Sequence, residues 1–418
     1  MQILSKISNR YKKEGFKVGT LHFLSNLLNP MKKFGKHITK TIIRFENKFS
    51  IKEMVVLECE SDMDDNPRAI YECLLKHQWN LNHKIIWLVQ DVKNCRELYK
   101  EKNVRFINRF NSANFNQIKL NYYLSRSKWF FFSHPYWFYK SKDEQIVVNT
   151  DHGSTINKKK ANGEINDRKT CSFDWILVPT EFSQKATYNF WPCSYEQMFF
   201  CGRPANDFLF QSDLVDLNSL ISGYNEGERI IICMPTYKQS KSSVDNKIKE
   251  KYLIDVVQTE DQMKELNFFL GQKGVHLILK AHPMQLTDEL QSNSFSNIHY
   301  IFNKDLFLKK VILYRLIGCC DALITDLSSV YIDYLMLNRP VAFFMNSVRN
   351  YSRGFNIDNF EDYLPGTKIF SYEDLKQFIT DVCKKNDLFQ EERLRVNTIL
   401  NPPKANYSEK ILKRFNVL

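Results

Sequence analysis

Short apolar runs recur along the chain from residue 54 onward, and polar stretches of helical length separate many of them. The runs are Met54–Leu57, Ile85–Val89, Val104–Ile107, Trp129–Ser133, Ile146–Asn149, Trp175–Val178 and Gln197–Cys201, then Arg229–Met234, Val275–Leu279, Ile298–Phe302, Asp321–Thr325 and Val341–Phe344. Nearly continuous apolar strands that alternate with helices are typical of a parallel sheet covered on both faces. The pattern therefore predicts an α/β protein.

A polar stretch with Ser222, Gly223, Asn225 and Gly227 interrupts this pattern, which then restarts. A chain of 418 residues is long enough for two domains of ordinary size. We predict two Rossmann-like domains, at residues 53–225 and 226–385, with a helical tail at 386–418. Ligands of open α/β sheets bind at the carboxyl ends of the strands, so we expect a site in the cleft between the domains.

The positive charge of the chain is concentrated at its N-terminus. The formal net charge is +12, and residues 1–52 hold 12 basic and 2 acidic side chains. Apolar residues recur at helical spacing there, with lysines between them, which predicts a basic amphipathic segment on an anionic membrane surface. A solvated helical arm packed on the body is the alternative. The near-neutral remainder shows no nucleic-acid module, so we expect no nucleic-acid partner.

The sequence also argues against several other classes. It contains no run of 18 apolar residues and no signal-peptide pattern, so we expect a peripheral protein at the cytoplasmic face of the cell membrane. The ten cysteines are scattered without metal-ligand spacing, so we expect reduced thiols, no metal site and no tightly bound cofactor. No glycine-rich dinucleotide or P-loop motif occurs.

The strongest candidate for chemistry is the segment from Asp321 to Leu337, in which an apolar strand ends in a polar turn before a helix. The turn holds Asp326, Ser328 and Ser329. One serine suffices for an N-cap, so the second is available to hold a phosphate at the helix start. A well-capped helix without a ligand is the structural alternative.

Three further polar loops follow apolar strands. The first holds His152 and Gly153, with an imidazole suited to act as a general base and a glycine that permits close approach. A nearby carboxylate, Asp151, is expected to raise the basicity of that imidazole. The other two loops contribute Thr236 with Lys238, and Lys280 with His282, which could hold a nucleotide or diphosphate. An inconsequential turn is the alternative for each.

These segments, in this order, resemble the CDP-glycerol glycerophosphotransferase family of teichoic-acid and capsule synthesis. The matching segments are His152-Gly153-Ser154, Asp174–Phe182, Gly202–Asp207, Met234–Lys238, Lys280–Pro283, Thr325–Asp333, Arg353–Phe355 and Leu364–Gly366. The resemblance runs from about residue 145 to about residue 370. Ala205 and Lys280 stand where the family usually or often has Arg, and Lys holds phosphate as a point charge rather than a fork.

The resemblance implies a GT-B fold, with an acceptor-side first domain and a second domain that binds a CDP-polyol. It implies attack of an acceptor hydroxyl on the β-phosphorus of CDP-glycerol with release of CMP, and no metal. The expected catalytic residues are His152 and His282. The expected substrate-binding residues are Lys280, Ser328, Ser329, Asp326, Thr236, Lys238, Arg353 and Gly153. The expected partners are the donor, a polymer or lipid-linked acceptor and the membrane surface.

Three alternatives remain open. A CDP-ribitol-dependent transferase would share every motif, and a GT-B glycosyltransferase would use a nucleotide sugar instead. A non-catalytic membrane-surface scaffold of the same fold is a different class, but a scaffold would not require His152, His282 and the serine pair. The sequence does not distinguish a primase from a polymerase.

Overall fold

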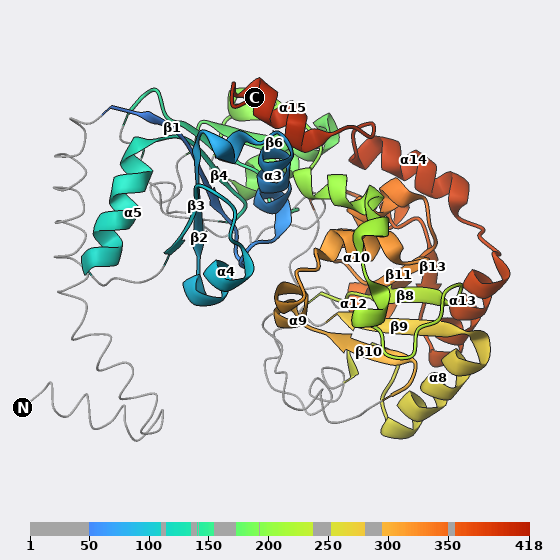
Figure 1. Cartoon of the computed structure of the whole chain (residues 1–418). Coiled ribbons are helices and arrows are strands. Elements are labelled where there is room, and N and C mark those ends of the chain that lie inside the picture. The colour runs from blue at the N-terminus through green and yellow to red at the C-terminus, as the bar shows by residue number, and fades with distance from the viewer. Residues whose placement is uncertain are drawn as a thin grey trace, which may run out of the picture.

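The computed structural model describes residues 50–109, 114–134, 140, 142–153, 173–191, 193–236, 252–280, 295–349 and 356–418. They form two α/β lobes, each built on a parallel sheet (Figure 1). The first sheet is seven-stranded in the order β3-β2-β1-β4-β5-β6-β7, and the second is six-stranded in the order β10-β9-β8-β11-β12-β13. Two Rossmann-like α/β domains are thus confirmed. The basic N-terminal segment lies outside the described residues, apart from its last residues.

The strands lie where the apolar runs predict them. The first sheet contains β1 (Lys52–Glu58), β2 (Lys84–Val89), β3 (Val104–Asn108), β4 (Ser127–Phe132), β5 (Ile146–Asn149), β6 (Trp175–Val178) and β7 (Met198–Phe200). The second contains β8 (Arg229–Cys233), β9 (Val275–Lys280), β10 (Ile298–Ile301), β11 (Ala322–Thr325), β12 (Val341–Phe344) and β13 (Thr367–Ile369). The sequence pattern did not predict β13.

Helices cover the faces of both sheets. They are α3 (Asp65–Lys76), α4 (Val92–Leu98), α5 (Asn114–Arg126), α6 (Gln184–Phe190), α8 (Glu260–Lys273), α9 (Asn303–Leu308), α10 (Leu313–Cys319), α11 (Val330–Tyr334), α12 (Met345–Arg349), α13 (Tyr372–Lys384), α14 (Gln390–Leu400) and α15 (Tyr407–Arg414). Local signals set their ends. Thr259 accepts a hydrogen bond from the Gln262 amide to start α8, and Gly274, at φ 60°, ends it.

The end of the chain contains α14 and α15 and returns to the first lobe (Figure 1). The indole nitrogens of Trp79 and Trp129 donate to the carbonyl oxygens of Val417 and Phe415, at 3.0 and 2.8 Å. Asp207, between the lobes in sequence, accepts from the amides of Tyr407 and Ser408 at the start of α15. The tail therefore ties the end of the chain to the core of the first lobe.

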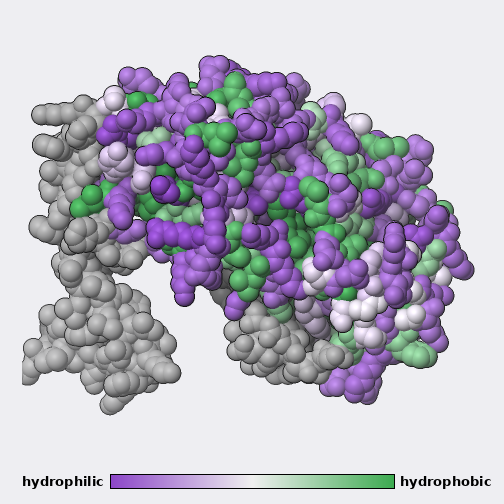
Figure 2. Space-filling view, viewed as in Figure 1, coloured by the Kyte–Doolittle hydropathy of each residue, from purple (hydrophilic) through white to green (hydrophobic). Residues whose placement is uncertain are grey.

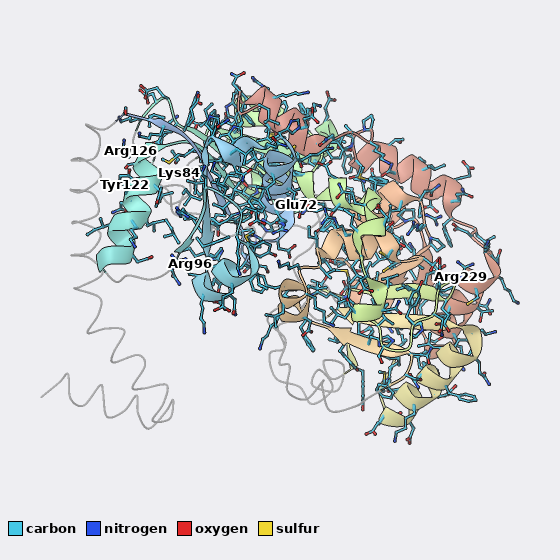
Figure 3. The ribbon with its side chains drawn as sticks, viewed as in Figure 1. Glu72, Lys84, Arg96, Tyr122, Arg126 and Arg229 are labelled. Carbon is cyan, nitrogen blue, oxygen red and sulfur yellow. The ribbon has the colours of Figure 1, made fainter. Side chains whose placement is uncertain are left out.

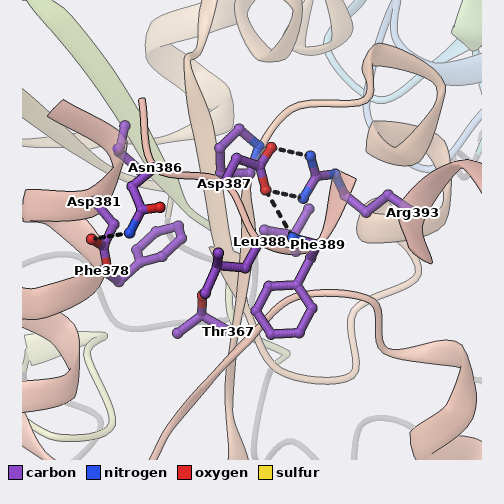
Figure 4. Close-up of a pocket in the computed structure, with 11 residues that line it drawn as sticks. Thr367, Phe378, Asp381, Asn386, Asp387, Leu388, Phe389 and Arg393 are labelled. Atoms are coloured by element: carbon purple, nitrogen blue, oxygen red, sulfur yellow. Dashed lines mark hydrogen bonds and ion pairs between the residues drawn. The ribbon is translucent and has the colours of Figure 1, made fainter. Parts of the chain in front are cut away.

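A small pocket lies where α13 leads into α14 (Figure 4). Its main polar feature is the fully buried Arg393, whose Nη1 donates to Asp387 Oδ1 at 2.8 Å. Asn386 donates to Asp381 beside it. These side chains satisfy one another and hold the corner before α14, so this pocket is structural rather than a candidate for chemistry.

The lobes contact each other through charged pairs as well as apolar residues. Glu72 on α3 lies at their junction (Figure 3), and its carboxylate pairs with Arg68 at 2.8 Å and with Arg315 of α10 at 2.5 Å. Polar side chains cover most of the visible face of both lobes, with apolar ones showing near the middle (Figure 2). The paired charges fix α3 against α10, and so one lobe against the other.

Candidate active site

The turn that follows β5 carries the first predicted site residues. Asp151, at φ 56°, is buried, and its carboxylate accepts from the Trp191 indole at 2.8 Å and the Gly153 amide at 3.3 Å. Asn66 donates to the carbonyl oxygens of Thr150 and Asp151, at 3.0 and 2.7 Å. The carboxylate of Asp151 and the Asn66 amide therefore shape the turn that carries His152.

His152 is oriented by its own Nδ1, which lies 3.0 Å from the carbonyl oxygen of Ser133. A carbonyl oxygen only accepts, so Nδ1 carries the proton and Nε2 keeps its lone pair. The His152 side chain is 26% exposed. An oriented imidazole with a free Nε2 is what a general base requires.

The pKa of His152 is lowered from its ordinary value of 6.5. Burial is the main cause and the charge of His134 adds to it, while Asp151 opposes them. Asp151 raises the basicity of this imidazole, as expected, but desolvation of the cation outweighs that effect and the overall pKa is lowered. At neutral pH the ring is uncharged and can accept a proton.

The turn that follows β11 is organised by Asp326. Its Oδ1 accepts from the backbone amides of Thr236, Leu327 and Ser328, at 2.8, 2.6 and 3.2 Å, and from the Thr236 hydroxyl at 2.6 Å. This carboxylate is buried and saturated. Asp326 and Thr236 thus hold each other and the start of the serine pair.

The expected serine cap is not present. Ser329 occupies the N-cap position of α11, but its hydroxyl makes no capping hydrogen bond. The amides of Tyr331 and Ile332 in the first turn donate instead to the backbone carbonyl oxygens of Ser328 and Ser329, while Asp326 accepts from amides that precede the helix. Both half-buried serines are therefore released from capping, which the sequence did not anticipate.

The two turns meet across the lobes. A Cβ placed on Gly153, which has φ 91°, would lie 2.7 Å from Ser329 Oγ and 3.1 Å from Arg203 Nη1. Only a glycine permits this approach and this backbone angle. The structure thus brings the His152-Gly153 turn of the first lobe against the serine pair of the second.

Lys280 lies at the end of β9, on the same edge of the second sheet, with β8 between it and the β11 turn. Its Nζ donates to Asn303 Oδ1 at 2.5 Å, and Asn303 donates to Ser61 Oγ of the first lobe at 3.0 Å. Burial lowers the Lys280 pKa to about 8, against the opposing charges of Asp64 and Asp305. An anion bound beside it would restore the positive charge.

Sequence reasoning missed a buried charged cluster beneath the two turns. Arg203 Nη1 pairs with Asp333 Oδ2 of α11 at 2.5 Å, and its Nη2 lies 3.4 Å from Asp65 Oδ1. The Tyr314 hydroxyl donates to the same Asp333 oxygen at 2.6 Å. Asp333 is the last residue of the Thr325–Asp333 segment, so the sequence offered a signal for it. Arg203 lies in the Gly202–Asp207 segment, but at a position that the family motif does not specify.

His282, Lys238 and Arg353 lie outside the described residues, so their assignments stay predictions. Among the described site residues, the structure brings Gly153 against Ser329, with His152 preceding Gly153 in its turn, and Ser328, Asp326 and Thr236 belong to the second turn. Lys280 lies on the same edge of the second sheet. In the described ranges no helix is long and apolar enough to cross a bilayer.

A cavity of about 450 Å³ opens between the lobes. The first-lobe wall comes from the loops after β1 and β2, including Glu60 and Ser61, and from α4 with Tyr99 at its end. The second-lobe wall comes from α9 and the residues after it, including Asn303 and Lys310. The Asn303 contact to Ser61 joins the two walls, and Asn303 also holds Lys280.

Comparison with known proteins identifies relatives over nearly the whole chain. Residues 42–415 match the family described as CDP-glycerol:poly(glycerophosphate) glycerophosphotransferase. The chain is 24% identical over 356 residues to a teichoic acid poly(glycerol phosphate) polymerase of Bacillus spizizenii, covering 79% of this chain and 82% of that protein. It is 24% identical over 402 residues to a teichoic acid glycerol-phosphate transferase of Staphylococcus aureus, covering 89% and 93%.

Among solved structures, the chain is similar to the wall teichoic acid polymerase TagF, with a TM-score of 0.73 at 20% identity, over 95% of this chain and 96% of that one. This likeness shows a shared fold. The family match covers far more than half of the chain and includes both turns and the charged cluster between them. The chain therefore belongs to the CDP-glycerol:poly(glycerophosphate) glycerophosphotransferase family.

Proposed function

We propose that this protein transfers glycerol phosphate from CDP-glycerol to a hydroxyl of a teichoic-acid or capsule polymer, or of a lipid-linked primer, and releases CMP. Family membership supports the donor and the type of acceptor. The observation that supports the proposal most is the approach of Gly153 to Ser329 across the lobes, because His152 precedes Gly153 in its turn and the Ser329 hydroxyl makes no capping hydrogen bond. This arrangement also supports the finer assignment of a GT-B enzyme.

In the proposed reaction, the acceptor oxygen bonds to the β-phosphorus while the bond from that phosphorus to the oxygen bridging it to the α-phosphate breaks. CMP leaves with that electron pair, and Nε2 of His152 takes the acceptor's proton. Ser328, Ser329 and Lys280 hold the diphosphate and the charge that develops on it, because phosphoryl transfer depends on positioning and electrostatics. From the resemblance, His282, Lys238 and Arg353 join them.

We propose that the acceptor approaches through the cavity between the lobes. Its walls end at Ser61 and Asn303, beside Lys280, and at Glu60, which contacts His134 beside His152. A hydroxyl delivered from that side would reach His152 without displacing the second-lobe turn. The acceptor-side role of the first domain rests on this geometry.

The donor is tested by offering CDP-glycerol, CDP-ribitol and nucleotide sugars to the full chain with a short synthetic acceptor, and measuring product mass. We expect CMP and a mass increase of one glycerol phosphate. Transfer from CDP-ribitol alone would replace the donor, and a nucleoside diphosphate product would indicate a glycosyltransferase. Absence of CDP-glycerol binding by calorimetry would favour the scaffold.

The role of His282 is tested by His282→Ala, which we expect to abolish turnover in a folded protein; near-normal turnover would refute it.

We further propose that residues 1–52 bind the cytoplasmic face of the membrane, since they carry most of the net charge. Removing residues 1–50 should then release the protein from anionic vesicles and spare activity on a soluble acceptor. Unchanged vesicle binding would refute the anchor.

A further inference from the structure

His134 and Glu60 form a pair beside His152 to which no role has been assigned. They follow β4 and β1, and these strands lie next to β5 in the order β1-β4-β5, so three neighbouring strands end at one place. His134 Nε2 lies 3.0 Å from Glu60 Oε2. The family segments quoted from the sequence include neither residue.

The pair touches His152 through ring stacking. The rings of His134 and His152 have centroids 4.3 Å apart and planes inclined by 21°. On its other sides, His152 meets the edges of Phe190 and Trp191, at 5.5 and 5.8 Å. Together with the hydrogen bond to the Ser133 carbonyl, these contacts leave the His152 ring one orientation.

The pair shifts both pKa values toward the charged forms. Burial lowers the pKa of His134, but the hydrogen bond it donates to Glu60 and the charges of Asp65, Glu60 and Glu58 outweigh burial and raise that pKa above 6.5. The same hydrogen bond lowers the pKa of Glu60 to about 2. Of the two stacked histidines, His134 therefore holds a proton more readily than His152, whose pKa is lowered.

The groups that face His152 come from four elements. Asp151 lies in its own turn, His134 follows β4, Asp65 begins α3, and the aromatic pair Phe190 and Trp191 ends α6. The two carboxylates favour protonation of His152, and His134 disfavours it. The charge of His134, when that ring is protonated, thus adds to burial in keeping the His152 ring neutral against Asp151 and Asp65.

We propose that His134, held by Glu60, is a positioning residue that fixes the plane of the His152 ring and keeps that ring uncharged, with Nε2 free to take the acceptor's proton. This inference rests on the proposed function, since it assigns His152 as the base. It deepens that function by naming what prepares the base. Glu60 also lines the interlobe cavity, so the pair links the acceptor's approach to the base.

The test uses His134→Phe, which keeps a stacked ring but removes the charge, and His134→Ala, which removes both. For His134→Phe we expect the acid limb of the pH profile of kcat/KM to move to higher pH, making kcat/KM about tenfold lower at a pH on that limb. CDP-glycerol affinity and the high-pH plateau should stay as in the wild type. For His134→Ala we expect kcat to fall at every pH, because orientation is lost.

The fold offers a matched control in His83. It also pairs with a glutamate, Glu53 at 3.1 Å, and stacks on a ring, Trp79 at 4.4 Å, but it precedes β2 at the opposite edge of the sheet. His83→Phe should leave the pH profile unchanged. A His134→Phe profile that coincides with the wild type would overturn the proposal, as would an equal shift in His83→Phe.

A second readout separates this inference from the proposed function. The His152 ring can be titrated by NMR in the full-length chain without substrate. We expect its pKa to rise in His134→Phe and to stay unchanged in His83→Phe. Failure of the wild type to turn over CDP-glycerol would sink the proposed function, whereas an unmoved His152 titration would sink the role of His134.

Discussion

The turns after β5 and β11 are both held in shape by an aspartate, but with different support from the rest of the lobe. In each, an aspartate directly or closely follows the strand, and its carboxylate accepts hydrogen bonds that hold the turn in shape. In the second lobe, one oxygen of Asp326 accepts hydrogen bonds from four donors. In the first lobe the turn holds positive φ at Asp151 and Gly153, and neighbouring strands supply the support through Ser133 and His134.

This difference predicts which substitutions should disrupt each turn. The second turn depends on a single carboxylate, so one substitution should undo it. The first depends on several weak contacts around one imidazole, so its parts should fail separately and show different pH behaviour. The four predictions that follow test this contrast, beginning with the largest expected effect.

Removal of the imidazole itself should have the largest effect on turnover. His152→Ala is expected to lower CMP release from CDP-glycerol by about 10³-fold, because a positioned general base contributes roughly 10²–10⁴-fold. Circular dichroism should show an unchanged fold, since the side chain is partly exposed. Near-normal release by the folded variant would remove His152 from the mechanism.

Loss of the Asp326 carboxylate should collapse the second turn. Asp326→Ala leaves three amides and a hydroxyl without their acceptor, so we expect turnover to fall about 100-fold and stability by about 3 kcal/mol, as buried unsatisfied donors cost roughly 1–3 kcal/mol each. Urea unfolding and CMP release measure the two.

Asp321 provides the control at the other end of the same strand. It accepts from the Ile230 amide and Arg229, each at 2.9 Å, before β11 begins. Asp321→Ala should lower stability without lowering kcat. If both variants lost the same turnover, Asp326 would have no particular part in the site.

One methyl group added at Gly153 should crowd the contact between the two turns. Gly153→Ala places a Cβ against Ser329 Oγ at a backbone angle of φ 91°, so we expect turnover to fall about tenfold and stability by about 1–3 kcal/mol. Gly227→Ala carries the same strain at φ 96° with no neighbour within 4 Å. It should lower stability alone; equal turnover in the two variants would argue against the contact.

Lys280 should make donor binding pH-dependent. Its pKa of about 8 means that the free protein loses this positive charge as pH rises through 8, so CDP-glycerol affinity should weaken above that pH. Lys280→Met should bind more weakly at pH 7 and lose this dependence. Lys368, whose pKa is also lowered to about 8 by burial, lies on β13, and Lys368→Met should keep the dependence.

The sequence predicts the strands and the two turns because both are local features. An apolar run followed by an aspartate, as at Asp151 and Asp326, marks the end of a strand without any knowledge of the tertiary structure. It misses β13, since Thr367–Ile369 is three residues long with a lysine in the middle. It also wrongly expects a serine cap on α11, whose first-turn amides donate to backbone carbonyl oxygens instead.

The unpredicted part of the site consists of contacts between distant segments. Arg203 and Asp333 are 130 residues apart in sequence, and the Glu60–His134 pair joins two strand ends. Nothing local distinguishes these residues from ordinary charged or polar ones. The overall shift of the His152 pKa is also decided by burial, which requires the fold.

The most direct test of the shared site measures CDP-glycerol binding by calorimetry in two variants, one from each lobe. Ser328→Ala/Ser329→Ala should bind the donor at least about tenfold more weakly, since two hydrogen bonds to a charged group are lost. His152→Ala should bind it as the wild type does and yet release no CMP. Unchanged donor affinity in the double-serine variant would contradict a diphosphate held between the two turns.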